Sequence, residues 1–128
     1  MEFTLKTILN ATAKDIYTAW LNSEKHSIMT GGDTITSDKL GDSFSVWDGY
    51  IHGKNLILEE NKRIVQSWRT SEFEKEEEDS QIEILLSEQD MVTELTLIHS
   101  NVPDGGEHYK KGWVEHYFEP MRAHFINQ

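Results

Sequence analysis

Six histidines have the widest chemical repertoire in this sequence, but their spacing does not favour a metal site. His108, His116 and His124 repeat every eight residues in the C-terminal region. On a helix that advances about 100° per residue, eight steps leave successive side chains roughly 80° apart, so the three imidazoles cannot converge on one ion. The chain also has no cysteine and no His-Glu-x-x-His spacing. We therefore predict no metal and no other cofactor.

No motif for nucleophilic catalysis or phosphate binding is present. The sequence has no Gly-x-Ser-x-Gly elbow and no glycine-rich phosphate loop, and we predict no catalytic residue. His99 ends a strand pattern on the same parity as Leu95 and Leu97. This position favours a core histidine that hydrogen-bonds a backbone carbonyl over a ligand-binding or proton-donating one. The pattern leaves open which face of its strand His52 occupies.

Four tryptophans are the second chemical signal. Trp20 and Trp113 fall on expected helix faces, whereas Trp47 and Trp68 end expected strands. A core role is favoured, because large aromatic side chains dominate the energetics of protein interiors. The alternative is a cavity that accepts an apolar ligand, since one sheet closes poorly around one helix and should leave a void. The candidate cavity residues are Trp47, His52, Trp68, His99, Trp113, Tyr117 and Met121.

The elements that must position these residues begin with one strand and two short helices. Alternating apolar residues predict a strand over Phe3–Leu9. Thr12 and Asp15 form a capping box at the start of a first helix, and Ser23 caps a second. Gly31-Gly32 ends the second helix, because glycine adopts left-handed conformations without steric cost.

A run of hairpin-linked strands follows, which predicts an antiparallel sheet. Asp48-Gly49 is the strongest turn signal and fits a two-residue hairpin turn. Further turns are expected at Glu60–Lys62 and Glu88–Asp90. The expected strands cover residues 34–37, 42–47, 50–59, 63–69, 81–86 and 91–99.

The C-terminal region predicts one long amphipathic helix with an aromatic stripe. Its apolar residues recur every four positions, and Pro120 should kink the helix or split off its last turn. The stripe consists of Tyr109, Trp113, Tyr117, Met121 and Phe125.

The composition excludes several classes of partner. A net charge of −11 argues against binding to nucleic acid or to an anionic membrane surface, which require basic footprints. The acidic run from Glu72 to Asp79 favours a solvated loop over a docking patch for a basic partner. We expect a cytoplasmic protein with one domain over residues 1–128, because the chain lacks cysteine, a signal peptide and a membrane-spanning apolar run.

Several sequence blocks, taken in order, resemble one known family. The chain is similar to the C-terminal domain of activators of the 90-kDa heat-shock chaperone ATPase, within the START-like, birch-pollen-allergen-like superfamily. The resemblance implies an α+β helix-grip fold, in which a strongly curved antiparallel sheet of six or seven strands wraps around a long C-terminal helix. The blocks are Asp48–Lys54, Arg63–Arg69, Thr93–His99, Val102-Pro103, Gly112-Trp113 and Tyr117–Pro120.

Three functions follow as hypotheses, in order of preference. The first is a non-enzymatic domain that binds a small hydrophobic or aromatic molecule under the C-terminal helix, as superfamily relatives bind lipids, hormones or polyketides. The second is a co-chaperone-like module that contacts a chaperone or another protein. The family's stimulating contacts lie largely in a further N-terminal domain, so we expect weak stimulation or none from this chain alone. The third is a cyclase-like or hydrolase-like enzyme that works in the cavity through His99, His52 or a tyrosine. A buried titratable group with a cavity opening would favour the third, an uninterrupted apolar cavity the first, and a filled core with an exposed apolar patch the second.

Overall fold

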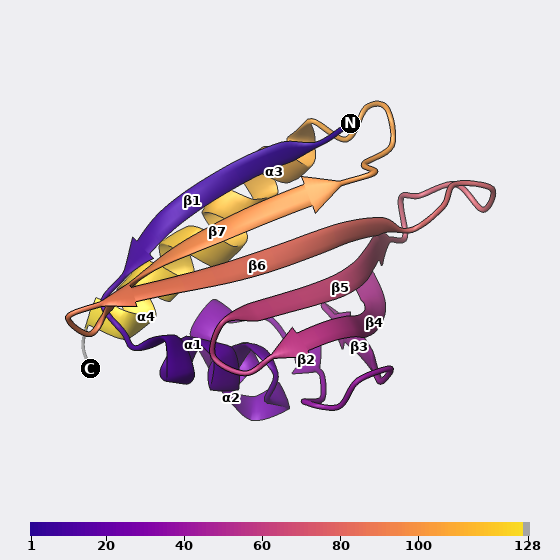
Figure 1. Cartoon of the computed structure of the whole chain (residues 1–128). Coiled ribbons are helices and arrows are strands. Elements are labelled where there is room, and N and C mark those ends of the chain that lie inside the picture. Colours follow the sequence, from indigo (N-terminus) through magenta and orange to yellow (C-terminus); the bar gives the residue numbers. More distant parts are fainter. Residues whose placement is uncertain (127–128) are drawn as a thin grey trace.

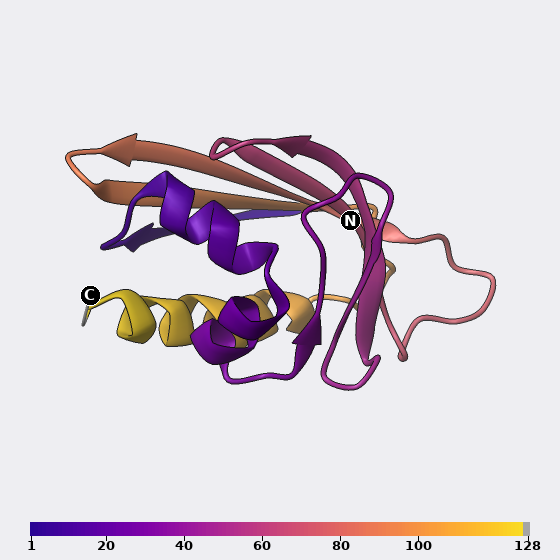
Figure 2. The same ribbon diagram turned by 90° about the horizontal axis from the view of Figure 1, so that it is seen from below.

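Seven antiparallel strands form one curved sheet, and a long C-terminal helix lies along its concave side (Figures 1 and 2). The computed structural model describes residues 1–126. The strands are β1 (Phe3–Leu9), β2 (Thr34–Ile35), β3 (Ser43–Val46), β4 (Ile51–Glu59), β5 (Arg63–Thr70), β6 (Ser80–Gln89) and β7 (Val92–Ser100). The helices are α1 (Ala13–Trp20), α2 (Ser23–Thr30), α3 (His108–Trp113), the π-helical turn η1 (Val114–Phe118) and α4 (Glu119–Ile126). The sheet order is β1-β7-β6-β5-β4-β3-β2, which confirms the predicted α+β helix-grip fold.

Strand alternation determines which side chains reach the helix. On β7, Thr93, Leu95, Leu97 and His99 are buried, whereas their neighbours point outward. This is the predicted parity, and it places His99 in the interior. The matching inward residues of β5 include Gln66 and Trp68, which are also buried.

The turn between β3 and β4 is longer than predicted. Val46 pairs with Ile51, so the connection has four residues, Trp47 to Tyr50, and is not a two-residue turn at Asp48-Gly49. Trp47 and Asp48 have φ values of 53° and 55°, and Gly49 has 89°. The reason is the packing of Trp47, whose indole lies so close to the Gly32 backbone that a Cβ on Gly32 would be 2.0 Å from Trp47 Nε1. The contact holds the tryptophan in a left-handed conformation that its side chain otherwise disfavours.

The turn between β6 and β7 is displaced from its predicted position. Gln89 pairs with Val92, so the turn consists of Asp90 and Met91 and not of Glu88–Asp90. Both turn residues have positive φ, as a type I′ hairpin turn requires. The Glu60–Lys62 turn lies where it was predicted, between Glu59 and Arg63, which pair with each other.

The C-terminal helix continues through Pro120 to Ile126, so of the two effects predicted for Pro120, a kink or a split-off last turn, the second is wrong. Proline lacks an N–H and clashes with the carbonyl four residues earlier. The π-helical turn η1, just before the proline, accommodates the missing N–H and the steric clash. In this turn the Glu119 N–H bonds to the Val114 carbonyl, five residues earlier. No helix within residues 1–126 combines the length and the apolar character that a membrane span requires.

The π-helical turn also keeps the aromatic stripe on the sheet. Residues four apart drift by about 40° per step on an α-helix, so the stripe from Tyr109 to Phe125 would rotate by about 160°. One additional residue in a π turn takes back about 100° of this rotation. All five stripe residues are buried in the structure.

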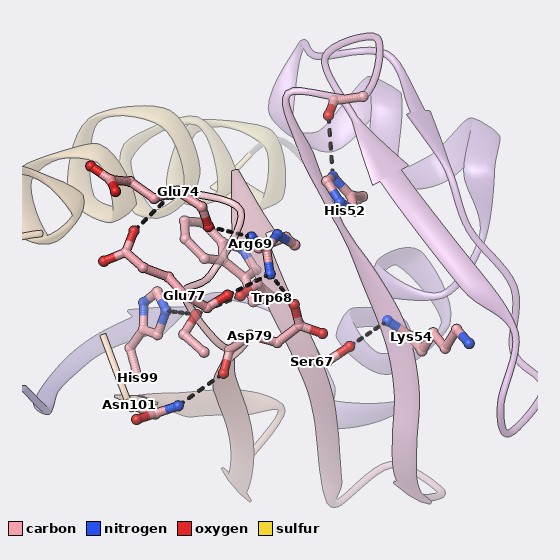
Figure 3. A network of polar contacts seen from close by, with 12 residues as sticks. His52, Lys54, Ser67, Trp68, Arg69, Glu74, Glu77, Asp79, His99 and Asn101 are labelled. Atoms are coloured by element: carbon pink, nitrogen blue, oxygen red, sulfur yellow. Dashed lines mark hydrogen bonds and ion pairs between the residues drawn. The ribbon is translucent and has the colours of Figure 1, made fainter. Parts of the chain in front are cut away.

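The acidic segment between β5 and β6 is a loop that projects from the end of the sheet (Figure 1), as predicted. Arg69 fastens it, because the guanidinium donates to the Glu74 and Glu77 carbonyls and pairs with Asp79 at 2.8 Å (Figure 3). The loop is therefore tethered to β5, while Glu74, Glu76 and Glu78 are exposed.

Candidate functional site

Aromatic rings fill much of the space between the helix and the sheet. Trp113 stacks on Trp20 at 6.4 Å between ring centres and lies 5.8 Å from Trp68 and 4.8 Å from Tyr117. The remaining hollow has a volume of about 10 Å³, which is at most the space of one water molecule. Trp20 of α1 completes the filling, which confirms the core role that the sequence favours for it.

A chain of hydrogen bonds fixes His99 as a neutral imidazole. The Trp113 indole can only donate, and it donates to His99 Nδ1 at 3.0 Å. His99 Nε2–H therefore donates to Ser80 Oγ at 2.9 Å, and the Ser80 hydroxyl donates to the Trp68 carbonyl at 2.6 Å. Burial, and then the N-terminal ammonium, lower the pKa of His99 to about 3. The histidine is in the core as predicted, but its partners are side chains and not a backbone carbonyl.

His26, on α2, is a second buried histidine with both nitrogens engaged. Its Nδ1–H donates to the Trp20 carbonyl at 2.8 Å, and the Tyr117 hydroxyl donates to its Nε2 at 3.1 Å. Burial lowers the pKa of His26 to about 4 and raises that of Tyr117. No pattern in the sequence distinguishes His26, because its short helix carries no clear apolar face.

Buried amides complete the interior network. The Trp20 indole donates to Gln66 Oε1 at 3.2 Å, and Gln66 Nε2 donates to Asn55 Oδ1 at 2.8 Å. These buried side chains thus bond to one another and to backbone carbonyls, and they leave no lone pair of His26 or His99 free for a substrate. Among residues 1–126, no cluster of three or more His, Cys, Asp or Glu side chains is arranged to hold a metal ion.

The best-formed hollow is an open groove of about 290 Å³ beside the helix, which we call the aromatic groove. It lies between the β3–β4 turn and the segment of α3 and η1. Its walls are mostly aromatic rings and carry few charges. The lining residues are Trp47, Tyr50, Ile51, Trp68, His108, Tyr109, Lys111, Gly112, Trp113, Glu115, His116 and Tyr117.

Four of the seven predicted cavity residues line this groove: Trp47, Trp68, Trp113 and Tyr117. His99 lies behind Trp113, and Met121 is fully buried farther along the helix, so neither borders the groove. His52 is exposed on the outer face of β4, away from His99 (Figure 3), and its assignment to the cavity is wrong. The reason is parity, because Ile51 takes the inward position beside it.

Sequence reasoning missed the polar rim of the groove. The Tyr50 hydroxyl donates to Glu72 Oε2, and His108 Nε2 lies 3.6 Å from the other oxygen of Glu72. Burial, and then the bond to Glu72, raise the pKa of Tyr50, so it remains a phenol at neutral pH. These residues come from the turn before β4, the acidic loop and the start of α3, and no local sequence pattern joins them.

Gly112 forms part of the groove wall from the middle of the helical segment. Glycine inside a helix costs roughly 0.5–1 kcal/mol relative to alanine. A Cβ at this position would meet no atom within 4 Å, so the fold itself does not require a glycine. Its effect is to leave the groove open at a point where any other residue would project a side chain.

A larger hollow of about 810 Å³ lies between α1, the start of α2 and the turns near residues 36–38 and 60–61. Its lining is mostly polar and charged, with Tyr17 as the only aromatic ring among the lining residues. It does not combine apolar walls with a few converging polar groups, as small-molecule sites usually do. The aromatic groove is therefore the better candidate.

Comparisons with known proteins agree with this fold. The family model described as "Activator of Hsp90 ATPase homolog 1-like protein" matches residues 10–125. An Activator of 90 kDa heat shock protein ATPase homolog from Dictyostelium discoideum is 28% identical over 123 residues, and an uncharacterized protein from Schizosaccharomyces pombe is 29% identical over 117. These matches cover 94% and 91% of this chain, but the chain spans only about a third (32% and 34%) of the two relatives.

Solved structures share the fold at low sequence identity. An HSP90 activator from Plasmodium falciparum aligns with a TM-score of 0.87 at 20% identity, covering 96% of this chain and 94% of its own. The Aha1 dimer from Colwellia psychrerythraea aligns with a TM-score of 0.82 at 16% identity, covering 100% of this chain and 98% of its own. Because the family model matches residues 10–125, which is nearly the whole of this chain, the chain belongs to the family of Activator of Hsp90 ATPase homolog 1-like proteins.

Proposed function

We propose that this domain binds a small, flat hydrophobic or aromatic molecule in the aromatic groove, without transforming it. The observation that carries the proposal is the groove itself, with about 290 Å³ of open space between aromatic walls. Pockets of this kind, apolar with a few polar groups, are the usual form of small-molecule sites. The site opens at the edge of the interface between the helix and the sheet, since Trp113 of the helix and Ile51 and Trp68 of the sheet line it.

The enzymatic hypothesis names His99, His52 or a tyrosine as the group that acts on the substrate. A general acid or base must reach the substrate, and both nitrogens of His99 are occupied by protein partners. His52 lies outside the groove. Because neither named histidine can act in the groove, we rank the enzymatic hypothesis last.

Gly112→Leu tests the proposal, because Gly112 lines the groove and a Cβ at this position would meet no atom within 4 Å. The experiment compares native mass spectrometry of the freshly expressed wild type and variant, together with tryptophan fluorescence titrations against fatty acids, sterols and flavonoids. We expect wild-type affinities on the order of micromolar and at least tenfold weaker binding by Gly112→Leu. Ala123→Leu is the control, since Ala123 is exposed on the same helical segment and does not line the groove. Equal affinities for the wild type and Gly112→Leu would place binding elsewhere, and no binding by the wild type would end the proposal.

The second candidate is a co-chaperone-like role in the cytoplasm, on a chaperone of the 90-kDa heat-shock class. Two observations favour it: the family match over residues 10–125, and an interior already filled by the protein's own rings. The test adds the purified chain to a 90-kDa heat-shock chaperone and measures its ATPase rate and co-precipitation. A stimulated rate that persists in Gly112→Leu would assign this role to a surface other than the groove. No change in rate and no co-precipitation would leave the role without support.

A further inference from the structure

The charges around the aromatic groove are predominantly negative. Glu115 lines the groove, and Glu72 holds two lining residues, Tyr50 and His108. The one ammonium group in the lining, Lys111, is largely exposed and lies 3.6 Å from Glu115, which offsets its charge. Two carboxylates, Glu72 and Glu115, thus lie at the groove against the one ammonium group of Lys111.

The walls supply a second attraction for positive charge. The ring faces of Trp and Tyr carry negative electrostatic potential, and a cation within about 6 Å of a ring centre is attracted to it. Six such rings line the groove: Trp47, Tyr50, Trp68, Tyr109, Trp113 and Tyr117. An ammonium group in a hollow of about 290 Å³ therefore lies near aromatic rings contributed by several elements.

The bond between Tyr50 and Glu72 links these two attractions. A phenol that donates a hydrogen bond to a carboxylate gains electron density on its ring, and this strengthens the attraction of the ring for a cation. The same bond holds the Glu72 carboxylate at the rim, next to the acidic loop that continues to Asp79. The whole chain, at −11, extends this attraction beyond the groove.

We propose that the aromatic groove selects organic cations, namely an ammonium group carried on a flat apolar body, over uncharged molecules of the same shape. This rests on the proposed function, since it names the chemical class of molecule that the groove takes. The charge supplies the preference, and the aromatic walls hold the apolar body.

A pair of isosteric probes tests the proposal separately from the function. The (4-hydroxyphenyl)trimethylammonium ion and 4-tert-butylphenol have the same shape and differ by one nitrogen in place of one carbon. Isothermal titration calorimetry of the wild type should give about tenfold tighter binding of the cation, a preference that shrinks as salt is raised. Equal affinities, or tighter binding of the neutral phenol, would overturn the cation preference and leave the proposed function standing. Binding of neither probe would overturn the preference and also count against the proposed function.

Glu72→Gln shows whether the preference comes from the rim. Glutamine keeps an oxygen that can accept the Tyr50 hydrogen bond but removes the charge. We expect it to weaken binding of the cation several-fold and to leave 4-tert-butylphenol unaffected. Glu76→Gln is the matched control, because it removes the same charge from an exposed position of the same loop. Equal losses from Glu72→Gln and Glu76→Gln would mean that only the overall charge matters, and would overturn the rim as the selective element.

Discussion

Trp113 is the residue on which the interior depends. Its ring stacks on Trp20 and packs against Trp68 and Tyr117, and its indole N–H completes the bonding of His99. A mutation at this position removes packing and also leaves a buried imidazole without its donor. Both losses act on the folded state, because the unfolded chain solvates the same groups.

Trp113→Ala should therefore lower the free energy of unfolding by about 3–5 kcal/mol, the range for deleting a large buried aromatic side chain. Urea denaturation followed by circular dichroism measures it. Lys111→Ala, two positions away, should change the free energy by no more than about 0.5 kcal/mol, since Lys111 is exposed. Similar losses in the two variants would contradict the assignment of Trp113 to the core.

At the scale of elements, local sequence patterns predict the strands and helices. The predictions are wrong where a contact between residues distant in the sequence determines the local conformation. The β7 parity that buries Leu95, Leu97 and His99 is visible in the sequence. The four-residue turn at Trp47 is not, because it depends on Gly32, which lies fifteen positions earlier. Likewise the core role favoured for Trp20 is confirmed, but its stacking on Trp113 depends on how α1 packs against the C-terminal helix, which no local pattern shows.

The π-helical turn gives the clearest prediction at this scale. Deleting Glu115, an exposed residue of η1, removes the additional residue, so ordinary helical winding should keep Met121 and Phe125 on the sheet. The deletion should still cost up to about 3 kcal/mol, because Pro120 then lies in a regular α-helix without the turn that accommodates it. Pro120→Ala in the deletion variant should recover this loss, and thermal and urea denaturation measure both. Glu115→Ala, which keeps the residue count, should stay within about 0.5 kcal/mol. A loss that persists with Pro120→Ala would show that the additional residue does not set the position of the stripe.

At the scale of the whole molecule, stability should depend on pH through two histidines in different elements. In the unfolded chain His26 and His99 take up protons near pH 6.5, whereas burial lowers their pKa values in the folded protein to about 4 and about 3. Between these limits the unfolded state binds more protons, so the free energy of unfolding rises with pH and is lost on acidification from about pH 6.5 downward. Each histidine contributes at most about 1.4 kcal/mol per pH unit in this window.

Because carboxylates titrate in part of the same range, the test is a difference between variants. His99→Gln and His26→Gln should each flatten the slope of unfolding free energy against pH between about pH 4.5 and 6.5 by up to about 1.4 kcal/mol per unit. His52→Gln, at an exposed position, should leave the slope unchanged. Urea denaturation at half-unit steps of pH measures all three. The hydrogen-bond chains explain the direction, because a protonated His99 would turn its Nδ1 from an acceptor into a donor facing the Trp113 N–H. Curves for His99→Gln and His26→Gln that run parallel to the wild type would mean that these imidazoles accept protons in the folded state without resistance, against the bonding seen in the core.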